Sequence, residues 1–80
     1  MTRLTPALRA YLCAIDALTA REGVPPTIIE IGDELGVRSK NGIHQMLVRA
    51  SKLGLVTWRP GLCRTLRLTT AGAVAAREAA

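Results

Sequence analysis

Residues 24–42 read VPPTIIEIGDELGVRSKNG, and this segment decides the fold. Thr27 and Glu30 have the spacing of a capping box, in which each side chain satisfies a backbone N–H at the start of a helix. Gly36 supplies the left-handed residue that commonly ends a helix, and Ser39 can cap the next one. In the helix that follows Thr27, the predicted inward positions are Ile28, Ile31 and Leu35. The segment therefore predicts two helices joined by a tight turn.

A longer helix is predicted before this segment. Thr5 can cap it, Pro6 suits its first position, and Gly23 is a typical helix end. Its large apolar residues recur at helical spacing: Leu8, Tyr11, Leu12, Ile15 and Leu18. Its opposite face carries small residues: Ala10, Cys13, Ala14 and Ala17. This small face can receive a C-terminal helix or a second subunit, and we expect docking of the chain's own helix.

A third helix and a hairpin follow the segment. The helix extends from its cap at Ser39 to Gly54. Its predicted inward positions are Ile43, Met46, Leu47, Ala50 and Leu53. Residues 55–59 and 64–69 have strand character, and Pro60-Gly61 between them is a turn signal.

The end of the chain is rich in alanine. Thr70 can cap a last helix over residues 71–80, which is marginal at this length unless it docks. The order helix, helix, turn, helix, hairpin is that of a winged helix-turn-helix, so we predict a mainly helical fold with a small β-hairpin. The prediction is one domain over residues 1–80, with core and wing in 5–69 and the C-terminal helix in 70–80.

Composition narrows the class of protein. The chain has 80 residues, of which 49% are hydrophobic and 21% charged, which indicates one globular domain. Cys13, Cys63 and a single histidine are too few for the usual zinc site or a disulfide scaffold, so we expect no metal and a reducing, cytoplasmic location. No apolar run is long enough to span a membrane. Without a nucleophile–base pair or a phosphate-binding loop, we expect neither an enzyme nor a cofactor, and no small-molecule ligand is evident.

Charge is distributed unevenly along the chain. Residues 1–34 carry a net charge of −2, whereas residues 35–77 contain no acid and carry +8. A solvated basic surface would give the same pattern. We favour a surface kept free of carboxylates because phosphates approach it, which suggests a polyanionic partner such as nucleic acid or an anionic membrane surface. With the helix order described above, we expect that partner to be double-stranded DNA.

The third helix has polar and basic residues on its outward side. The outward residues are Asn41, His44, Gln45, Val48, Arg49 and Lys52. The amides of Asn41 and Gln45 suit the adenine edge, and a helix of this kind fits the major groove. The predicted backbone contacts are Arg38, Lys40, Arg49 and Lys52, together with Thr27, where the start of the helix offers a hydroxyl and free backbone N–H groups to a phosphate. The wing carries Arg59, Arg64 and Arg67, and an arginine there can enter a narrow minor groove.

The residues quoted above resemble the DNA-binding domain of LexA-type repressors. The shared pattern is PPT..EI...LG..S.N within residues 24–42, and the likeness extends over about residues 5–68. The resemblance implies base contacts from the start of the third helix, at Ser39, Asn41, Gly42, His44 and Gln45. LexA-type repressors also carry a self-cleaving serine–lysine domain that dimerises them, and we do not expect that activity in a chain ending at Ala80.

Alternatives to these interpretations remain open at this point. The chain could be a winged-helix adaptor or antirepressor that uses Ile28, Ile29 and the alanine faces to bind protein. A homodimer through the C-terminal helix or the small face of the first helix would enlarge a small DNA interface. Gly42 weakens its helix by up to about 1 kcal/mol relative to alanine, which a close approach of a partner would explain. Trp58 is predicted to pack on the wing, with base stacking as the alternative.

Overall fold

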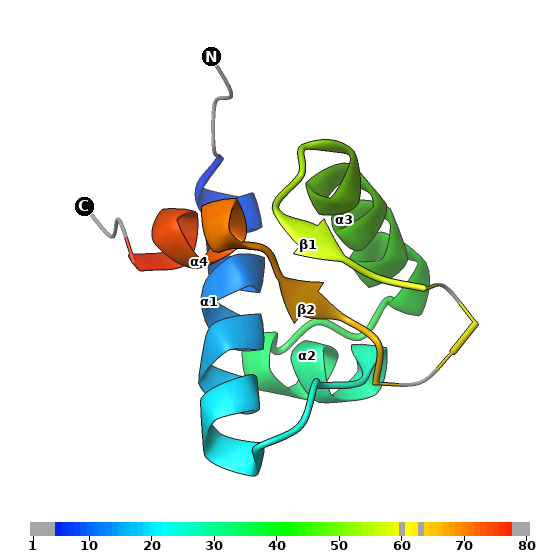
Figure 1. Cartoon of the computed structure of the whole chain (residues 1–80). Coiled ribbons are helices and arrows are strands. Elements are labelled where there is room, and N and C mark those ends of the chain that lie inside the picture. Colours follow the sequence, from blue (N-terminus) through cyan, green and yellow to red (C-terminus); the bar gives the residue numbers. More distant parts are fainter. Residues whose placement is uncertain (1–4, 60, 63, 78–80) are drawn as a thin grey trace.

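A computed structural model describes residues 5–59, 61–62 and 64–77. The elements are α1 (Pro6–Glu22), α2 (Ile28–Leu35), α3 (Lys40–Lys52), β1 (Val56–Thr57), β2 (Arg67–Leu68) and α4 (Thr70–Arg77). Figure 1 shows α1 as an upright rod, with α2 beside its lower part, α4 across its upper part and α3 on the far side of the hairpin. This order and the two-stranded antiparallel sheet confirm the predicted winged helix-turn-helix.

Local capping sets the helix boundaries where the sequence predicts them. Thr5 accepts a hydrogen bond from the backbone N–H of Leu8, and Ser39 accepts one from that of Gly42. The capping box at the start of α2 is complete in both directions. Gly36 ends α2 with a φ of 71°, in the left-handed region that glycine adopts without steric cost.

The core lies where α1, α2, α3 and the hairpin meet. Its largest fully buried side chains are Leu8, Leu12, Ile15, Ile31, Ile43 and Leu47. All of these are predicted inward positions. Leu53 was also predicted to face inward, and this prediction is wrong, because its side chain is 38% exposed. Leu53 is the C-terminal cap of α3 and follows its last helical residue, so the helical spacing that predicted an inward side chain no longer holds there.

The wing has a shorter ladder than the sequence predicts. Val56 pairs with Leu68 and Thr57 with Arg67, so each strand has two residues rather than five or six. Beyond this ladder the side chain of Thr65 replaces the backbone pairing, because its hydroxyl oxygen accepts a hydrogen bond from the N–H of Arg59 at 3.0 Å. Pro60 of the predicted turn, and Cys63, lie outside the described residues.

α4 docks on α1, as the favoured expectation had it. Ala14 and Ala76 are buried between these helices, and the thiol of Cys13 donates a hydrogen bond to the carbonyl oxygen of Ala76 at 3.3 Å. The predicted cap at Thr70 is wrong by one residue, because Thr69 accepts the hydrogen bond from the N–H of Gly72 at 3.0 Å. Residues 78–80 of the predicted helix lie outside the described part.

Candidate nucleic-acid interface

α3 is held against α2 by a close backbone approach at Gly32. A Cβ on Gly32 would lie 2.6 Å from the carbonyl oxygen of Val37 and 2.9 Å from Cδ1 of Ile43. Only glycine leaves room for this approach. Gly32 is not among the residues singled out from the sequence, although a glycine inside a predicted helix is itself a signal of tight packing. The contact fixes which side of α3 is buried.

The outward side of α3 is therefore free of the core. Asn41 and Gln45 are exposed, as are the basic side chains of Arg49 and Lys52, whereas Val48 is half-buried. A shallow depression along this side is lined by Gln45, Val48, Arg49, Lys52 and Leu53. The structure thus brings together the amide and basic side chains that the helical spacing predicts on one face.

At the start of α3 the backbone is open to an external partner. Ser39 and Lys40 are exposed. A Cβ on Gly42 would meet only the side chain of Ser39, at 3.4 Å and 3.7 Å, which is ordinary van der Waals contact. No tight packing inside the protein therefore requires glycine at this position, unlike at Gly32.

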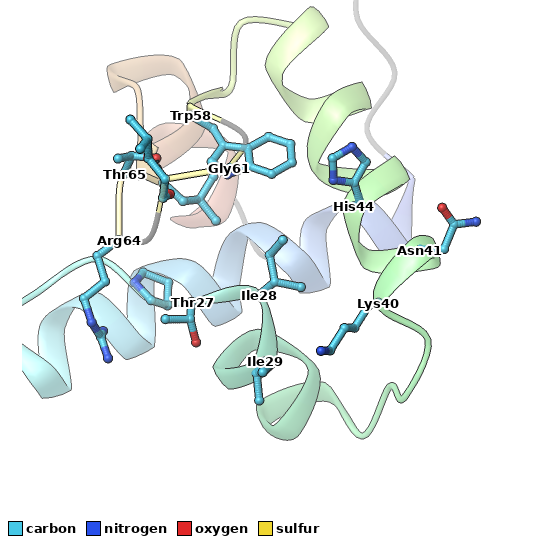
Figure 2. Close-up of a pocket in the computed structure, with 13 residues that line it drawn as sticks. Thr27, Ile28, Ile29, Lys40, Asn41, His44, Trp58, Gly61, Arg64 and Thr65 are labelled. Atoms are coloured by element: carbon cyan, nitrogen blue, oxygen red, sulfur yellow. Dashed lines mark hydrogen bonds between the residues drawn. The ribbon is translucent and has the colours of Figure 1, made fainter.

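His44 lies beside the wing rather than on the outermost side of α3. Its ring packs edge-on against Trp58, with ring centroids 5.0 Å apart and an interplanar angle of 69° (Figure 2). Trp58 is partly buried and packs against the core, which confirms its predicted packing role. The aromatic pair links α3 to the hairpin, and T-shaped geometry of this kind is favourable.

The three wing arginines do not share one environment. Arg59 and Arg67 are exposed. Arg64 instead forms a bidentate ion pair with Glu30 of α2, with Nη1 3.2 Å from Oε1 and Nη2 3.1 Å from Oε2. Its Nη1 also donates to the carbonyl oxygen of Pro25 at 3.0 Å. Arg64 therefore connects the wing to the start of α2. This role was not predicted from the sequence, where Arg64 was assigned to DNA contact.

This contact also supports an unusual backbone. Arg64 has a φ of 58°, in the left-handed region that costs a non-glycine residue about 1–2 kcal/mol. A bidentate guanidinium–carboxylate pair and a third hydrogen bond offset that cost.

Thr27 has less capacity for phosphate than predicted. Its backbone N–H donates to Oε1 of Glu30 at 2.9 Å, and its hydroxyl oxygen accepts from the N–H of Glu30 at 3.2 Å. The capping box thus uses the backbone N–H of Thr27 and that of Glu30, so these two are not among the free N–H groups that the start of α2 can offer to a phosphate. The hydroxyl proton remains as the only donor that this residue can offer.

Glu30 receives both the cap and the arginine. The backbone N–H of Thr27, and after it the guanidinium of Arg64, hold the pKa of Glu30 below its usual value. Because the folded-state pKa is the lower one, ionised Glu30 stabilises the fold above its unfolded pKa of about 4.3. That contribution is lost as the pH falls through the folded-state pKa.

Glu30→Gln is therefore expected to be less stable than the wild type at pH 7, with a gap that narrows as the pH falls below about 4.3. Urea unfolding at pH 7 and pH 3 measures the gap. Asp33→Asn, which removes one negative charge from the exposed side of the same helix, is the matched control. A gap for Glu30→Gln that stays constant with pH would contradict the assignment.

In residues 5–59, 61–62 and 64–77, no three His, Cys, Asp or Glu side chains are grouped so that they could hold a metal ion. No helix in the same residues is long and apolar enough to cross a bilayer.

Known proteins match the chain along most of its length. A family model described as LexA DNA binding domain matches residues 1–65. The LexA repressor of Halorhodospira halophila is 40% identical over 78 residues, which cover 98% of this chain and 34% of that protein. The LexA repressor of Geotalea uraniireducens is 37% identical over 76 residues, which cover 95% of this chain and 37% of that protein. The LexA repressor of Tolumonas auensis is 34% identical over 70 residues, which cover 88% of this chain and 34% of that protein.

The chain spans about a third of the length of these relatives. The resemblance inferred from residues 24–42 is confirmed, and the open, acid-free side of α3 lies within the matched residues. On the sequence match and the winged helix-turn-helix together, the chain belongs to the LexA DNA binding domain family.

Proposed function

We propose that this protein binds double-stranded DNA in a sequence-specific way and acts as a small transcriptional repressor in the bacterial cytoplasm. α3 enters the major groove, and the wing lies on the adjacent backbone or minor groove. One observation carries the proposal: the side of α3 opposite the core is exposed, and it presents amides and cations without a carboxylate. The family match supports the same partner, because its description is DNA binding.

The roles of the side chains follow from their chemistry. Asn41 and Gln45 read base edges, because a side-chain amide pairs with the donor and acceptor of adenine. Ser39 and Gly42 lie at the same end of α3, where the open space beside Gly42 admits a base edge or sugar. His44 borders this end from the wing side and is a secondary base contact.

Cations around this helix neutralise phosphates and set the register of the protein on the duplex. The proposed backbone contacts are Arg38, Lys40, Arg49 and Lys52, with the hydroxyl of Thr27 as a weaker donor. Arg59 and Arg67 are the proposed groove contacts of the wing. Arg64 is left out of this set, because its guanidinium is bound to Glu30.

A second copy of the chain would enlarge the interface. A single module of this size buries only about 600–1,000 Å² on DNA, and dimers bind two half-sites. α4 covers Ala14 of α1, so the surfaces left for a partner are the outer side of α4, where Val74 is 50% exposed, and the exposed residues Ala10, Cys13 and Ala17 of the small face. The protein-binding adaptor receives no support from the matching family.

The first test is a gel-shift titration against genomic fragments, followed by sequencing of the bound DNA. A retarded band and an enriched sequence are expected. No retardation even at low salt would overturn the proposal.

Substitutions separate base contacts from backbone contacts. Asn41→Ala and Gln45→Ala are each expected to reduce discrimination between the enriched site and a mismatched site by about 1–3 kcal/mol. Lys52→Ala is expected to weaken binding to all duplexes about equally. Competition binding with both duplexes measures the difference, and Arg21→Ala on α1 is the control for loss of a cation elsewhere. Identical effects of the two kinds of substitution would contradict these roles.

A further inference from the structure

A cavity opens between the start of α2, the start of α3 and the wing (Figure 2). Its volume is about 460 Å³, within the range of about 300–1,000 Å³ typical of small-molecule sites. Its lining is mostly apolar and includes Ile28, Ile29, Trp58 and Leu62. Ile29 and Leu62 are each 57% exposed, so a large part of this apolar surface is in contact with water. An apolar ligand would remove that surface from water.

One wall of the cavity is aromatic. Trp58 and His44 meet edge-on with centroids 5.0 Å apart, and both line the cavity. Ile28 and Ile29 come from the first turn of α2 and both line the cavity. In Figure 2 the Ile28 side chain points toward Trp58 and His44. A flat ring between these walls would contact aromatic and aliphatic side chains together, an arrangement that suits aromatic ligands.

The charge of the lining is positive. Lys40 and Arg64 are its two cations, and no acidic side chain is among the described residues that line it. The guanidinium of Arg64 is compensated by Glu30 at 3.1 Å, whereas Lys40 takes part in none of the ion pairs found in the described residues. Asn41 and His44 lie at the same end as Lys40 and can donate hydrogen bonds.

We propose that this cavity binds a small amphipathic anion: an aromatic or other flat apolar body carrying one carboxylate, sulfonate or phosphate group. The apolar body occupies the space between Ile29 and Trp58, and the anionic group lies at Lys40. Binding at this site requires no DNA, so the inference goes beyond the proposed function.

A regulatory consequence follows if the proposed function holds. Lys40 is also a proposed phosphate contact, and the cavity lies between α3 and the wing, the two elements proposed to contact DNA. A bound anion would neutralise Lys40 and occupy the space beside it. The ligand therefore competes with DNA and acts as an effector that weakens binding.

The test uses 8-anilinonaphthalene-1-sulfonate, an aromatic anion, with the purified wild-type chain. Trp58 is the only tryptophan, so energy transfer from Trp58 reports that the probe is bound to the protein, and the variants below locate it. Saturable binding of one probe per chain with transfer from Trp58 is expected. Binding without saturation, or without transfer, would overturn the proposal.

Variants test the two halves of the site. Lys40→Gln is expected to weaken binding of the sulfonate probe about two- to fivefold, as for an exposed ion pair, and to leave the uncharged analogue N-phenyl-1-naphthylamine unaffected. Ile29→Glu is expected to weaken both probes at least about tenfold, because it places a charge against the apolar body. An acidic residue in the first turn of α2 is compatible with folding.

Val74→Glu is the matched control for Ile29→Glu. Val74 is 50% exposed on α4, away from the cavity, so the variant should bind both probes as the wild type does. Equal losses in Val74→Glu and Ile29→Glu would mean that the probes bind exposed apolar surface in general, and the cavity would carry no site.

A final titration measures DNA binding with the sulfonate probe at saturation. Weaker DNA binding in the wild type, but not in Ile29→Glu, is expected. Unchanged DNA affinity at saturation would overturn the competition. A chain that binds the probe and no DNA at all would overturn the proposed function and leave the cavity site standing.

Discussion

Gly72→Ala is expected to destabilise the folded domain by about 1–3 kcal/mol, the usual cost of inserting a group into a packed core. A Cβ at this position would overlap the carbonyl oxygen of Leu55 and lie 2.9 Å from its carbonyl carbon. These are backbone atoms, so no side chain can rotate to make room. The Leu55 carbonyl also accepts a hydrogen bond from the N–H of Thr69 at 3.0 Å, which a shift of α4 would break.

Urea unfolding, followed by circular dichroism and by Trp58 fluorescence, measures the loss. Gly42→Ala is the control, because it makes the same substitution in a helix where the new methyl group meets only Ser39. It should stabilise the domain by up to about 1 kcal/mol, the helix-propensity gain. Gly72→Ala matching the wild type would mean that the contact between α4 and Leu55 is looser than described.

DNA affinity is expected to fall about 10³-fold when the salt concentration rises from 50 to 200 mM. The proposed phosphate and groove cations are all exposed: Arg38, Lys40, Arg49, Lys52, Arg59 and Arg67. If each neutralises one phosphate, the slope of log affinity against log salt is about −5. Fluorescence anisotropy with a labelled duplex at several salt concentrations gives this slope.

The double variant Arg49→Gln with Lys52→Gln should make that slope shallower by about 2. Arg21→Gln removes a cation whose guanidinium is bound to Glu34 at 3.2 Å, on the side formed by α1 and α2, and should leave the slope as it is. A wild-type slope near zero would refute phosphate contact by these residues. A slope that Arg21→Gln reduces equally would mean that net charge, and not the α3 surface, drives binding.

Features that depend on neighbouring residues could be predicted from the sequence. The caps at Thr5, Thr27 and Ser39 depend on a hydrogen bond to a residue three positions away, so local spacing was sufficient. The cap of α4 could not be predicted in this way, because Thr69 and Thr70 are adjacent and chemically identical. Thr69 is the cap because the fold places its hydroxyl beside Gly54, to whose carbonyl oxygen it donates a hydrogen bond at 2.7 Å.

The candidate interface likewise has features that helical spacing predicts and contacts that form only in the folded protein. Helical spacing predicted the exposed side of α3, because a residue's side of a helix depends only on its position in the sequence. The partner of Arg64 was beyond that reasoning, since Glu30 lies 34 residues earlier and only the folded wing brings the two together. The contact between His44 and Trp58 likewise requires the hairpin to fold back toward α3.

The placement of α4 has a practical consequence for measurement. In Figure 1, α4 lies against α1 on one side of the molecule, and α3 lies on the other. Arg77, its last residue, immediately follows Ala76, which contacts Cys13 of α1. A biotin tether or fluorescent label attached at position 77 would therefore lie on the side of the molecule away from α3. A sensor chip coated through that tether would hold each copy by the side opposite its basic α3 surface.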